Sequence, residues 1–276
     1  MRDIIITSTD SKYGDFLINH WLKSLRHNVD LSNIDVLVLD YGLSREQKML
    51  LKEEDVAIRK CKRNGSVVII RYRDAADFLS KHEYGQVLLV DSGDIIFQDD
   101  IKKMFEKNKS QFRALCEKYF PRDMNKSFSR FFTPGDIKKM QPVLKHRPMI
   151  NSGVIIGPAK KIERLCEEVW NTIQDKTRFG PDQKVVNYVL YRDGFKMLDE
   201  GYNMVVATSK NGFYVKNGVF YFKNGIKIPI VHNAGNVSFL RPIENFGYGA
   251  GHNQVKKLVY HSIRCVGRVR SAIMGD

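Results

Sequence analysis

Two aspartates end an apolar run near the middle of the sequence. Residues 87–100 read VLLVDSGDIIFQDD, in which four apolar residues precede Asp91 and Asp94. An unbroken apolar run is typical of a strand buried on both faces of a parallel sheet, and such sheets bind ligands at the carboxyl ends of their strands. Two carboxylates on a tight turn repel each other, so a divalent cation with oxygen ligands is a natural partner. The alternative is that one acid caps a turn and the other faces water.

Three later segments carry polar groups that a cation site or its substrate would use. Asn151 and Ser152 interrupt an apolar strand pattern, which indicates either a close approach of backbone to a ligand or a bulge. Asp182 and Gln183 open a predicted helix, where Asp182 is either a simple cap or faces a cleft together with Gln183. His232 follows another apolar run and is either structural or the third ligand of the cation.

The elements that would position these residues alternate along the chain. β-Branched residues predict a first strand at 4–9, and apolar residues at helical spacing predict a helix after it. An apolar run at 67–70 and a predicted helix at 75–79 lead to the central strand. This alternation predicts an α/β fold, with a mostly parallel sheet flanked by helices. Asn-Gly pairs at 217–218 and 224–225 predict hairpins, and therefore a smaller antiparallel part near the C-terminus.

The amino-acid composition restricts the cellular compartments in which we expect the protein and the classes of partner it could bind. The 276 residues, 43% of them hydrophobic, suffice for one large or two small cores. The sequence shows neither a bilayer-spanning apolar segment nor a signal-peptide pattern, and its four cysteines are scattered. We therefore expect a protein of the reducing cytoplasm. The formal net charge of +14 favours an anionic partner such as a nucleotide, a nucleic acid or an acidic lipid surface.

Two segments depart from the alternation of strands and helices. Residues 119–149 mix aromatic, basic and proline residues, which predicts an excursion from the sheet. It is either a lid or acceptor-binding element, or a variable surface insertion. Residues 251–276 repeat apolar residues at helical spacing with bases on the opposite side, so we expect a domain at 1–250 followed by a basic amphipathic helix. That helix either attaches to the inner face of an anionic membrane or packs on the domain.

In this order, the motifs resemble those of glycosyltransferases of the GT-A fold. The most similar group is the retaining family 8 type, related to bacterial lipopolysaccharide galactosyl- and glucosyltransferases. The family's DxD motif resembles VLLVDSGDIIF, and its strand that contacts the donor sugar resembles INSGVIIG. The family's Asp-Gln helix start resembles PDQKVVN, and its histidine segment resembles VHNAG. The resemblance covers roughly residues 3–240.

The sequence departs from the family pattern at two places. Family members have the two acids two positions apart, whereas Asp91 and Asp94 are three apart, with Gly93 where the second acid would fall. Asp94 remains a plausible ligand whether Asp91 or Ser92 occupies the first position. The family also often has a phosphate-binding lysine six residues after the histidine, where this chain has Ser238. The candidates to replace it are Lys210, Lys216, Lys223 and Arg241.

The resemblance implies a metal-dependent glycosyltransferase of cell-envelope or lipopolysaccharide biosynthesis. Such an enzyme moves a hexose from a nucleotide diphosphate sugar, a UDP-sugar in the first place, to a glycan or lipid-linked acceptor with retention. The implied metal ligands are Asp91, Asp94 and His232, and an imidazole ligand favours Mn²⁺ over Mg²⁺.

The resemblance also assigns the donor contacts. Thr7, Asp10 and Tyr13 would bind the base and ribose, and Arg73 would approach the phosphates. Asn151, Ser152 and Asp182 would hold sugar hydroxyls, and Ser92 belongs with Asp91 to the donor-binding turn. Gln183 would lie near the anomeric carbon and, with Asp182, complete the catalytic pair. In an inverting enzyme Asp182 would instead be the general base.

Two other functions stay open on the residues alone. A nucleotidyltransferase shares the sheet, but the turn at 7–14 lacks its glycine-rich, arginine-containing loop. A sugar-nucleotide-binding protein without turnover would explain the altered acid spacing. Binding of nucleic acid is not expected, because the sequence carries no helix-turn-helix, zinc or RNP signature and acids oppose a phosphate backbone at the cleft.

Overall fold

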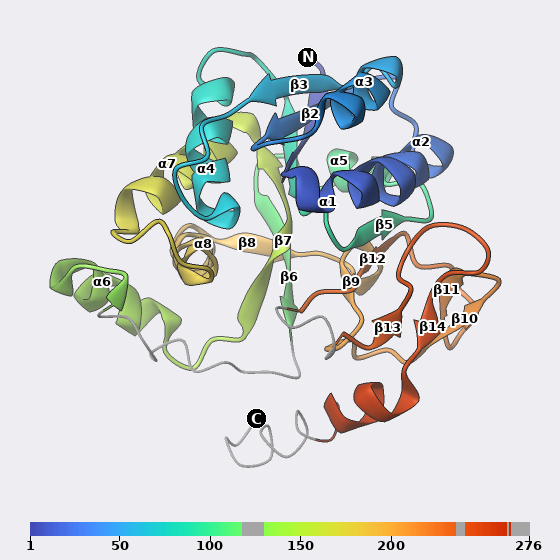
Figure 1. Cartoon of the computed structure of the whole chain (residues 1–276). Coiled ribbons are helices and arrows are strands. Elements are labelled where there is room, and N and C mark those ends of the chain that lie inside the picture. The colour runs from blue at the N-terminus through green and yellow to red at the C-terminus, as the bar shows by residue number, and fades with distance from the viewer. Residues whose placement is uncertain (118–129, 236–240, 264, 266–276) are drawn as a thin grey trace.

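The structure is a computed structural model that describes residues 1–117, 130–235, 241–263 and 265 (Figure 1). Within these residues the main sheet has the strand order β3-β2-β1-β4-β7-β6-β8. The strands are β1 (Asp3–Thr9), β2 (Ile34–Asp40), β3 (Ala57–Lys60), β4 (Gln86–Val90), β6 (Phe112–Glu117), β7 (Met149–Pro158) and β8 (Phe195–Met197). Only β7 runs against its neighbours, β4 and β6, so the prediction of a mostly parallel sheet is confirmed.

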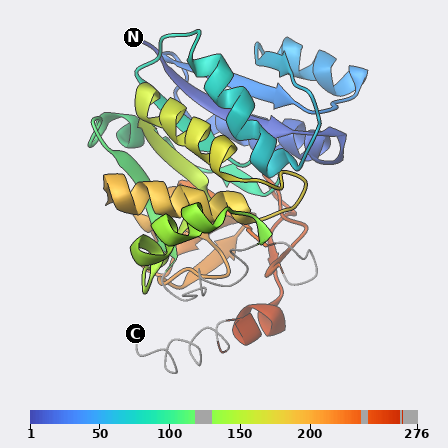
Figure 2. The same ribbon diagram turned by 90° about the vertical axis from the view of Figure 1, so that its left-hand side faces the viewer.

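Helices cover both faces of this sheet (Figures 1 and 2). On one face lie α4 (Val67–Leu79), α7 (Ala159–Thr172) and α8 (Pro181–Asp193). On the other lie α1 (Ser11–Phe16), the π-helical turn η1 (Leu17–Leu22), α2 (Lys23–Asn28), α3 (Arg45–Glu53) and α5 (Lys102–Glu106). Ile4 and Ile6 of β1 pack with the first group and Ile5 with the second, and none is more than 2% exposed. Burial on both faces is why the strands read as unbroken apolar runs.

The helix predicted at 75–79 is longer than the sequence indicated. It begins at Val67, so the β-branched run 67–70 forms the first turn of α4. Ile69 and Ile70 are fully buried, and this burial outweighs the intrinsic preference of β-branched residues for strands. Arg71 and Arg73 consequently lie on one helix.

A second sheet joins the C-terminal part to the central strand. It consists of β5 (Ile95–Phe97), β12 (Ile230–His232) and β9 (Met204–Val205), after the 3-10 turn η3 (Glu200–Tyr202). His232 pairs with Ile95 across the antiparallel β12–β5 ladder, and the Asn233 N–H donates to the carbonyl of Asp94 at 2.9 Å. This pairing brings the histidine segment to the acidic turn.

Two short hairpin-like sheets complete the C-terminal part. β10 (Phe213–Lys216) and β11 (Val219–Phe222) form the predicted hairpin, with Asn217 and Gly218 both at positive φ, as a two-residue Asn-Gly turn requires. β13 (Ile243–Glu244) pairs with β14 (Gln254–Val255), and the helical turn that follows covers 257–263. The terminal helix therefore begins later than the expected residue 251. Residues 264 and 266–276 lie outside the described part.

Part of the predicted excursion at 119–149 belongs to the core. The helix α6 (Pro134–Leu144) packs on α8, and Met140 and Leu144 join the core on that face of the sheet. Residues 118–129 are not described. The excursion leaves the sheet and returns to it at one place, since Glu117 of β6 pairs with Met149 of β7. Among the described residues, none of the helices has both the length and the apolar composition needed to cross a bilayer.

Candidate metal and donor site

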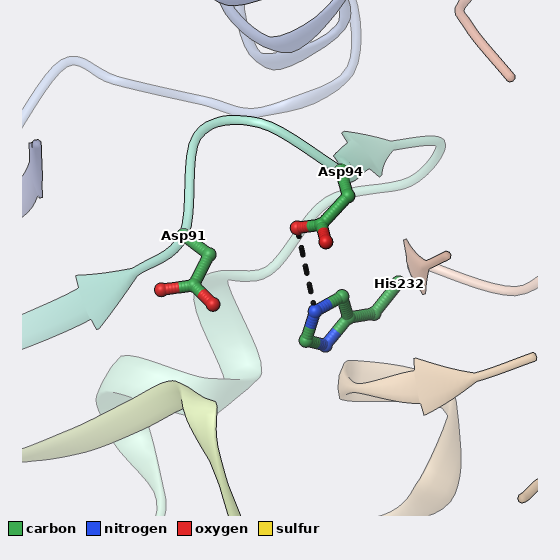
Figure 3. A group of neighbouring side chains, drawn as sticks. All are labelled: Asp91, Asp94 and His232. Carbon is green, nitrogen blue, oxygen red and sulfur yellow. Dashed lines mark ion pairs between the residues drawn. The ribbon is translucent and has the colours of Figure 1, made fainter. Parts of the chain in front are cut away.

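Asp91, Asp94 and His232 meet at the carboxyl edge of the main sheet (Figure 3). Asp91 directly follows β4, Asp94 directly precedes β5, and His232 ends β12. One potential ligand atom from each residue lies within 4.8 Å of the others, and the imidazole Nε2 is 3.4 Å from the Asp94 Oδ1. The structure thus brings together the three residues that the sequence suggested as metal ligands.

Two glycines lie in close contact with side chains at this site, and one of them, Gly153, allows the close grouping. A Cβ atom at Gly153 would lie 2.4 Å from the His232 Cε1 and 2.9 Å from the Asp91 Oδ2. The Gly153 carbonyl also accepts a hydrogen bond from the Asp91 N–H at 2.9 Å, which fixes the turn after β4. A Cβ atom at Gly93 would lie 2.9 Å from the Tyr13 ring. The unusual spacing of the acids therefore coincides with a glycine that is covered by Tyr13.

A buried chain of hydrogen bonds fixes the orientation of His232. The Gly153 N–H donates to the Asn151 Oδ1 at 2.9 Å, and because a backbone N–H only donates, the amide orientation of Asn151 is set. The Asn203 Nδ2 donates to the same oxygen at 3.1 Å. The Asn203 Oδ1, at 3.0 Å, must then accept from the His232 Nδ1. His232 therefore carries a proton on Nδ1 and turns Nε2 toward the acids, as histidine ligands of metals do.

The charges around Nε2 fit a cation. Burial alone would lower the pKa of His232, but the carboxylate of Asp94 raises it. Burial likewise acts to raise the pKa of Asp94, yet His232 and then Arg241 hold it below its ordinary value. The Asp94 carboxyl thus stays ionised, and Nε2 shares either a proton or a metal ion with it. Two carboxylates and one imidazole suit Mn²⁺ better than Mg²⁺, which prefers oxygen ligands.

Two arginines lie beside the acids. The Arg71 guanidinium hydrogen-bonds the Asp91 carboxylate and lies 4.0 Å from that of Asp182. Burial alone would lower the pKa of Arg71, but Asp91 and Asp182 raise it above its ordinary value, so its charge is fixed. The Arg241 Nη2 lies 3.1 Å from the Asp94 Oδ2. Of the four candidates for the missing phosphate-binding lysine, Arg241 is the one in contact with the acidic group.

Arg73, expected near the donor phosphates, lies elsewhere. Its guanidinium pairs with Asp74 at 2.8 Å and donates to the Asn64 Oδ1 at 2.7 Å. Two positions along a helix correspond to a rotation of about 200°, so Arg71 and Arg73 point to opposite sides of α4. The sequence alone does not distinguish the two arginines, because the apolar run at 67–70 is not recognisable there as the first turn of α4.

The residues expected to bind base and ribose lie at the end of β1, and several are engaged within the protein. The Thr7 hydroxyl donates to the Val90 carbonyl at 2.8 Å, and the Ser92 hydroxyl donates to a β1 carbonyl at 2.8 Å. The Asp10 carboxylate caps α1 and pairs with Arg63 at 3.0 Å. Tyr13 is 38% exposed. Thr7 and Ser92 therefore join strands, whereas Asp10 and Tyr13 follow β1 in the chain, at the carboxyl edge of the sheet.

On the sugar side, Asp182 and Gln183 begin α8 as expected. Burial raises the pKa of Asp182 to about 6, against the opposing effect of Arg71. The Gln183 Nε2 donates to the Ile150 carbonyl at 3.0 Å, which ties α8 to β7. Ser152 is partly exposed, whereas the Asn151 amide is buried in the hydrogen-bond chain. Asn151 therefore helps to orient the candidate metal ligand His232 through buried hydrogen bonds.

A cavity opens beside this hydrogen-bond chain. It is lined by the carboxylates of Glu117 and Glu200, by the polar loop 208–211, and by apolar residues that include Leu198 and Val205. Glu117 is 6% exposed, and its Oε1 accepts a hydrogen bond from the Asn151 Nδ2 at 2.8 Å. The sequence had singled out neither Glu117 nor Asn203, because both matter through contacts between distant segments.

Solved structures with a similar fold include glycosyltransferases. The galactosyltransferase LgtC in complex with donor and acceptor sugar analogues matches with a TM-score of 0.56 at 14% identity, over 95% of both chains. An active-site mutant of LgtC matches with a TM-score of 0.58 at 14% identity, again over 95% of both. The bifunctional glycosyltransferase WbbM matches with a TM-score of 0.55 at 15% identity, over 85% of this chain and 46% of its own.

These likenesses concern the fold. Neither protein-family models nor curated protein sequences match this chain. The chain spans nearly the full length of LgtC but less than half of WbbM. The expected GT-A-like architecture, a mostly parallel sheet flanked by helices with small antiparallel sheets, is confirmed.

Proposed function

We propose that this protein is a metal-dependent glycosyltransferase that moves a hexose from a nucleotide diphosphate sugar, in the first place a UDP-sugar, to a glycan or lipid-linked acceptor. The observation that carries the proposal is the meeting of Asp91, Asp94 and His232 at the carboxyl edge of the sheet. The GT-A-like fold supports it, because the LgtC structure of the same fold was solved with donor and acceptor sugar analogues.

The charged residues of the site would assist diphosphate release in two ways, by holding a metal ion and by supplying positive charge. Mn²⁺, or Mg²⁺, bound by the three ligands would act as a Lewis acid toward the departing phosphate oxygens. Arg71 and Arg241 flank the acids and offer further positive charge where negative charge develops. Arg71 takes the role that the sequence had suggested for Arg73.

The donor would extend along the carboxyl edge from β1 toward β7. Tyr13 and Asp10 would contact the base and ribose, with Thr7 and Ser92 holding the strand ends in place. Ser152 and Asp182 would bind sugar hydroxyls, and Gln183 would hold the first turn of α8 close to the anomeric carbon.

We favour retention of configuration, in which the leaving phosphate accepts the proton of the acceptor. The second candidate is inversion with Asp182 as general base. A pKa of about 6 leaves this carboxyl mostly ionised at neutral pH and able to accept a proton. The anomeric configuration of the product, read by proton NMR, decides between the two.

The acceptor would enter from the cavity beside Glu117. Its two carboxylates and polar loop offer hydrogen-bond partners for sugar hydroxyls, and its apolar residues offer contact with a sugar face. The terminal helix would place the enzyme on the inner face of a membrane, where a lipid-linked acceptor of cell-envelope biosynthesis is found. Localisation in the cytoplasm follows from this placement.

The direct test is a screen of nucleotide sugars by thermal shift, with and without Mn²⁺, followed by donor turnover. A ligand at about a hundred times its dissociation constant adds about 2.7 kcal/mol to the free energy of unfolding. A transferase binds one nucleotide sugar with Mn²⁺ and slowly hydrolyses it. Binding without hydrolysis would indicate a sugar-nucleotide-binding protein, and release of pyrophosphate from a nucleoside triphosphate and a sugar phosphate would indicate a nucleotidyltransferase.

A further inference from the structure

The β10–β11 hairpin exposes an aromatic and basic surface outside the donor site. Side chains alternate between the two faces of a strand. One face of the hairpin packs in the core of the C-terminal part, with residues that include Ile96 and Val231; its side chains are Phe213 and Val215 on β10, and Phe220 and Phe222 on β11. The other face carries what we call the hairpin face: Tyr214, Lys216, Tyr221 and Lys223, together with Ile226 and Lys227 of the next turn.

The hairpin face has an ordered arrangement. Tyr214 and Tyr221 are directly opposite each other in the antiparallel register, and their ring centroids are 5.4 Å apart with an interplanar angle of 17°. Lys227 forms an antiparallel backbone bridge with Tyr221, on the side away from Tyr214. Tyr214, Tyr221 and Lys227 are therefore neighbours in a row across the strands. Tyr214 is 43% exposed and Ile226 is 60% exposed. Large apolar groups are thus left uncovered next to lysines.

The charge around this face is strongly one-sided. Residues 201–276 contain ten lysines and arginines but only two aspartates and glutamates. Lys216 and Lys223 flank the tyrosines and are exposed, and Lys227 lies 3.6 Å from the carboxylate of Asp99. The excess of positive charge complements an anionic surface.

We infer that the hairpin face docks on an anionic lipid surface. Tyrosine suits the level of the lipid headgroups, because its ring is apolar and its hydroxyl is polar, and nearby lysines are attracted to anionic headgroups. A glycan is the less fitting occupant, because the two rings are stacked on each other, which occupies one face of each ring. A protein partner is left as an outcome of the test.

The described part of the terminal helix lies beside the hairpin. Tyr260 contacts Phe213 edge-on with ring centroids 5.3 Å apart, and Leu258 is 85% exposed. The hairpin face therefore adds a second contact next to the one proposed for the terminal helix. This inference rests on the proposed function and adds a membrane contact to it. Vesicle binding is measured without a nucleotide sugar, so the membrane contact and the transferase activity can be disproved separately.

The test is co-sedimentation of the full chain with vesicles of phosphatidylcholine and of an equimolar phosphatidylcholine–phosphatidylglycerol mixture. We expect binding to the anionic vesicles alone. Lys216→Gln with Lys223→Gln should lower the partition coefficient about 25-fold, at about fivefold per lysine. The control with equal charge change is Lys138→Gln with Lys139→Gln, two exposed positions on α6 at the other side of Figure 1. It should bind like the unchanged chain.

A second variant tests the aromatic contribution. Tyr214→Ser with Tyr221→Ser removes exposed rings and keeps every charge, and we expect at least a threefold lower partition coefficient. Equal binding by the hairpin variants and the α6 control would overturn the inference. So would loss of binding only in Leu258→Ser, which would assign the membrane contact to the terminal helix alone. Equal binding to neutral and anionic vesicles would contradict the charge argument. Failure of the unchanged chain to bind either kind of vesicle would overturn the inference, and a stable complex with a protein that the hairpin variants lose would assign the face to that partner instead.

Discussion

The His232 Nδ1 lies 3.0 Å from the Asn203 Oδ1, and this contact sets the tautomer of the imidazole. The Gly153 N–H sets the direction of this hydrogen bond, because it fixes the amide orientation of Asn151 and, through Asn151, that of Asn203. A backbone group on β7 thereby decides which nitrogen of a side chain on β12 is free to bind a cation.

Replacing Asn203 with leucine should therefore weaken Mn²⁺ binding. Removing the partner that orients a histidine ligand costs about 10- to 100-fold in metal affinity. Free Mn²⁺ measured by electron paramagnetic resonance gives the affinity directly. The control is Asn253→Leu, a similarly buried asparagine whose side chain bonds Gly218 and Gly247 instead. Equal loss in both variants would mean that general destabilisation, not ligand orientation, is responsible.

Mn²⁺ affinity should fall as the pH falls through the pKa of His232. Burial acts to lower this pKa, but Asp94 raises it, so the Nε2 proton is held more tightly than usual and must leave before the metal binds. In the metal-free protein the sign is opposite: the ion pair stabilises the fold at low pH and loses its contribution as the pH rises through the raised pKa. Calorimetric titration over a pH series measures the first effect. His232→Gln should flatten the profile, and an unchanged slope in that variant would assign the proton to another group.

The two neighbouring arginines of α4 should respond differently to the same substitution. Arg71→Met removes a charged donor beside Asp91 and should lower donor turnover about 100- to 1,000-fold. Arg73→Met removes a partner of Asp74 and should change turnover less than about threefold, because that pair is partly exposed. Steady-state kinetics with the preferred nucleotide sugar compares them. Similar losses in both would move the phosphate contact away from Arg71.

An added methyl group at Gly153 should disrupt the ligand set more than one at Gly93. At Gly153 the new Cβ would meet the buried His232 ring and Asp91, whereas at Gly93 it would meet the partly exposed ring of Tyr13, which is free to shift. We expect Gly153→Ala to lower Mn²⁺ affinity at least 10-fold and Gly93→Ala to leave it within about threefold. Calorimetry on both variants provides the comparison. Matching affinities would show that the close approach at Gly153 is not needed for metal binding.

The sequence was informative where function and local structure coincide. Asp91, Asp94 and Asp182 follow patterns that also end a strand or begin a helix, so their place at the sheet edge was predictable. Asn203 and Glu117 carry no such pattern, because their importance arises from hydrogen bonds to segments far away in the chain. The pairing of β5 with β12 is equally non-local, and it is what carries His232 to the acids.

The reversed direction of β7 has a consequence for how such a protein diversifies. Since β6 and β7 are antiparallel neighbours, the connection between them departs at Glu117 and arrives at Met149, two paired residues on a single rim. A connection whose two ends are paired with each other can change in length or composition without altering the register of either strand. Asp91, Asp94 and His232 meet at the same rim, so a substitution at either end of this connection would change the surroundings of the acidic group and leave the strands that position it unaltered.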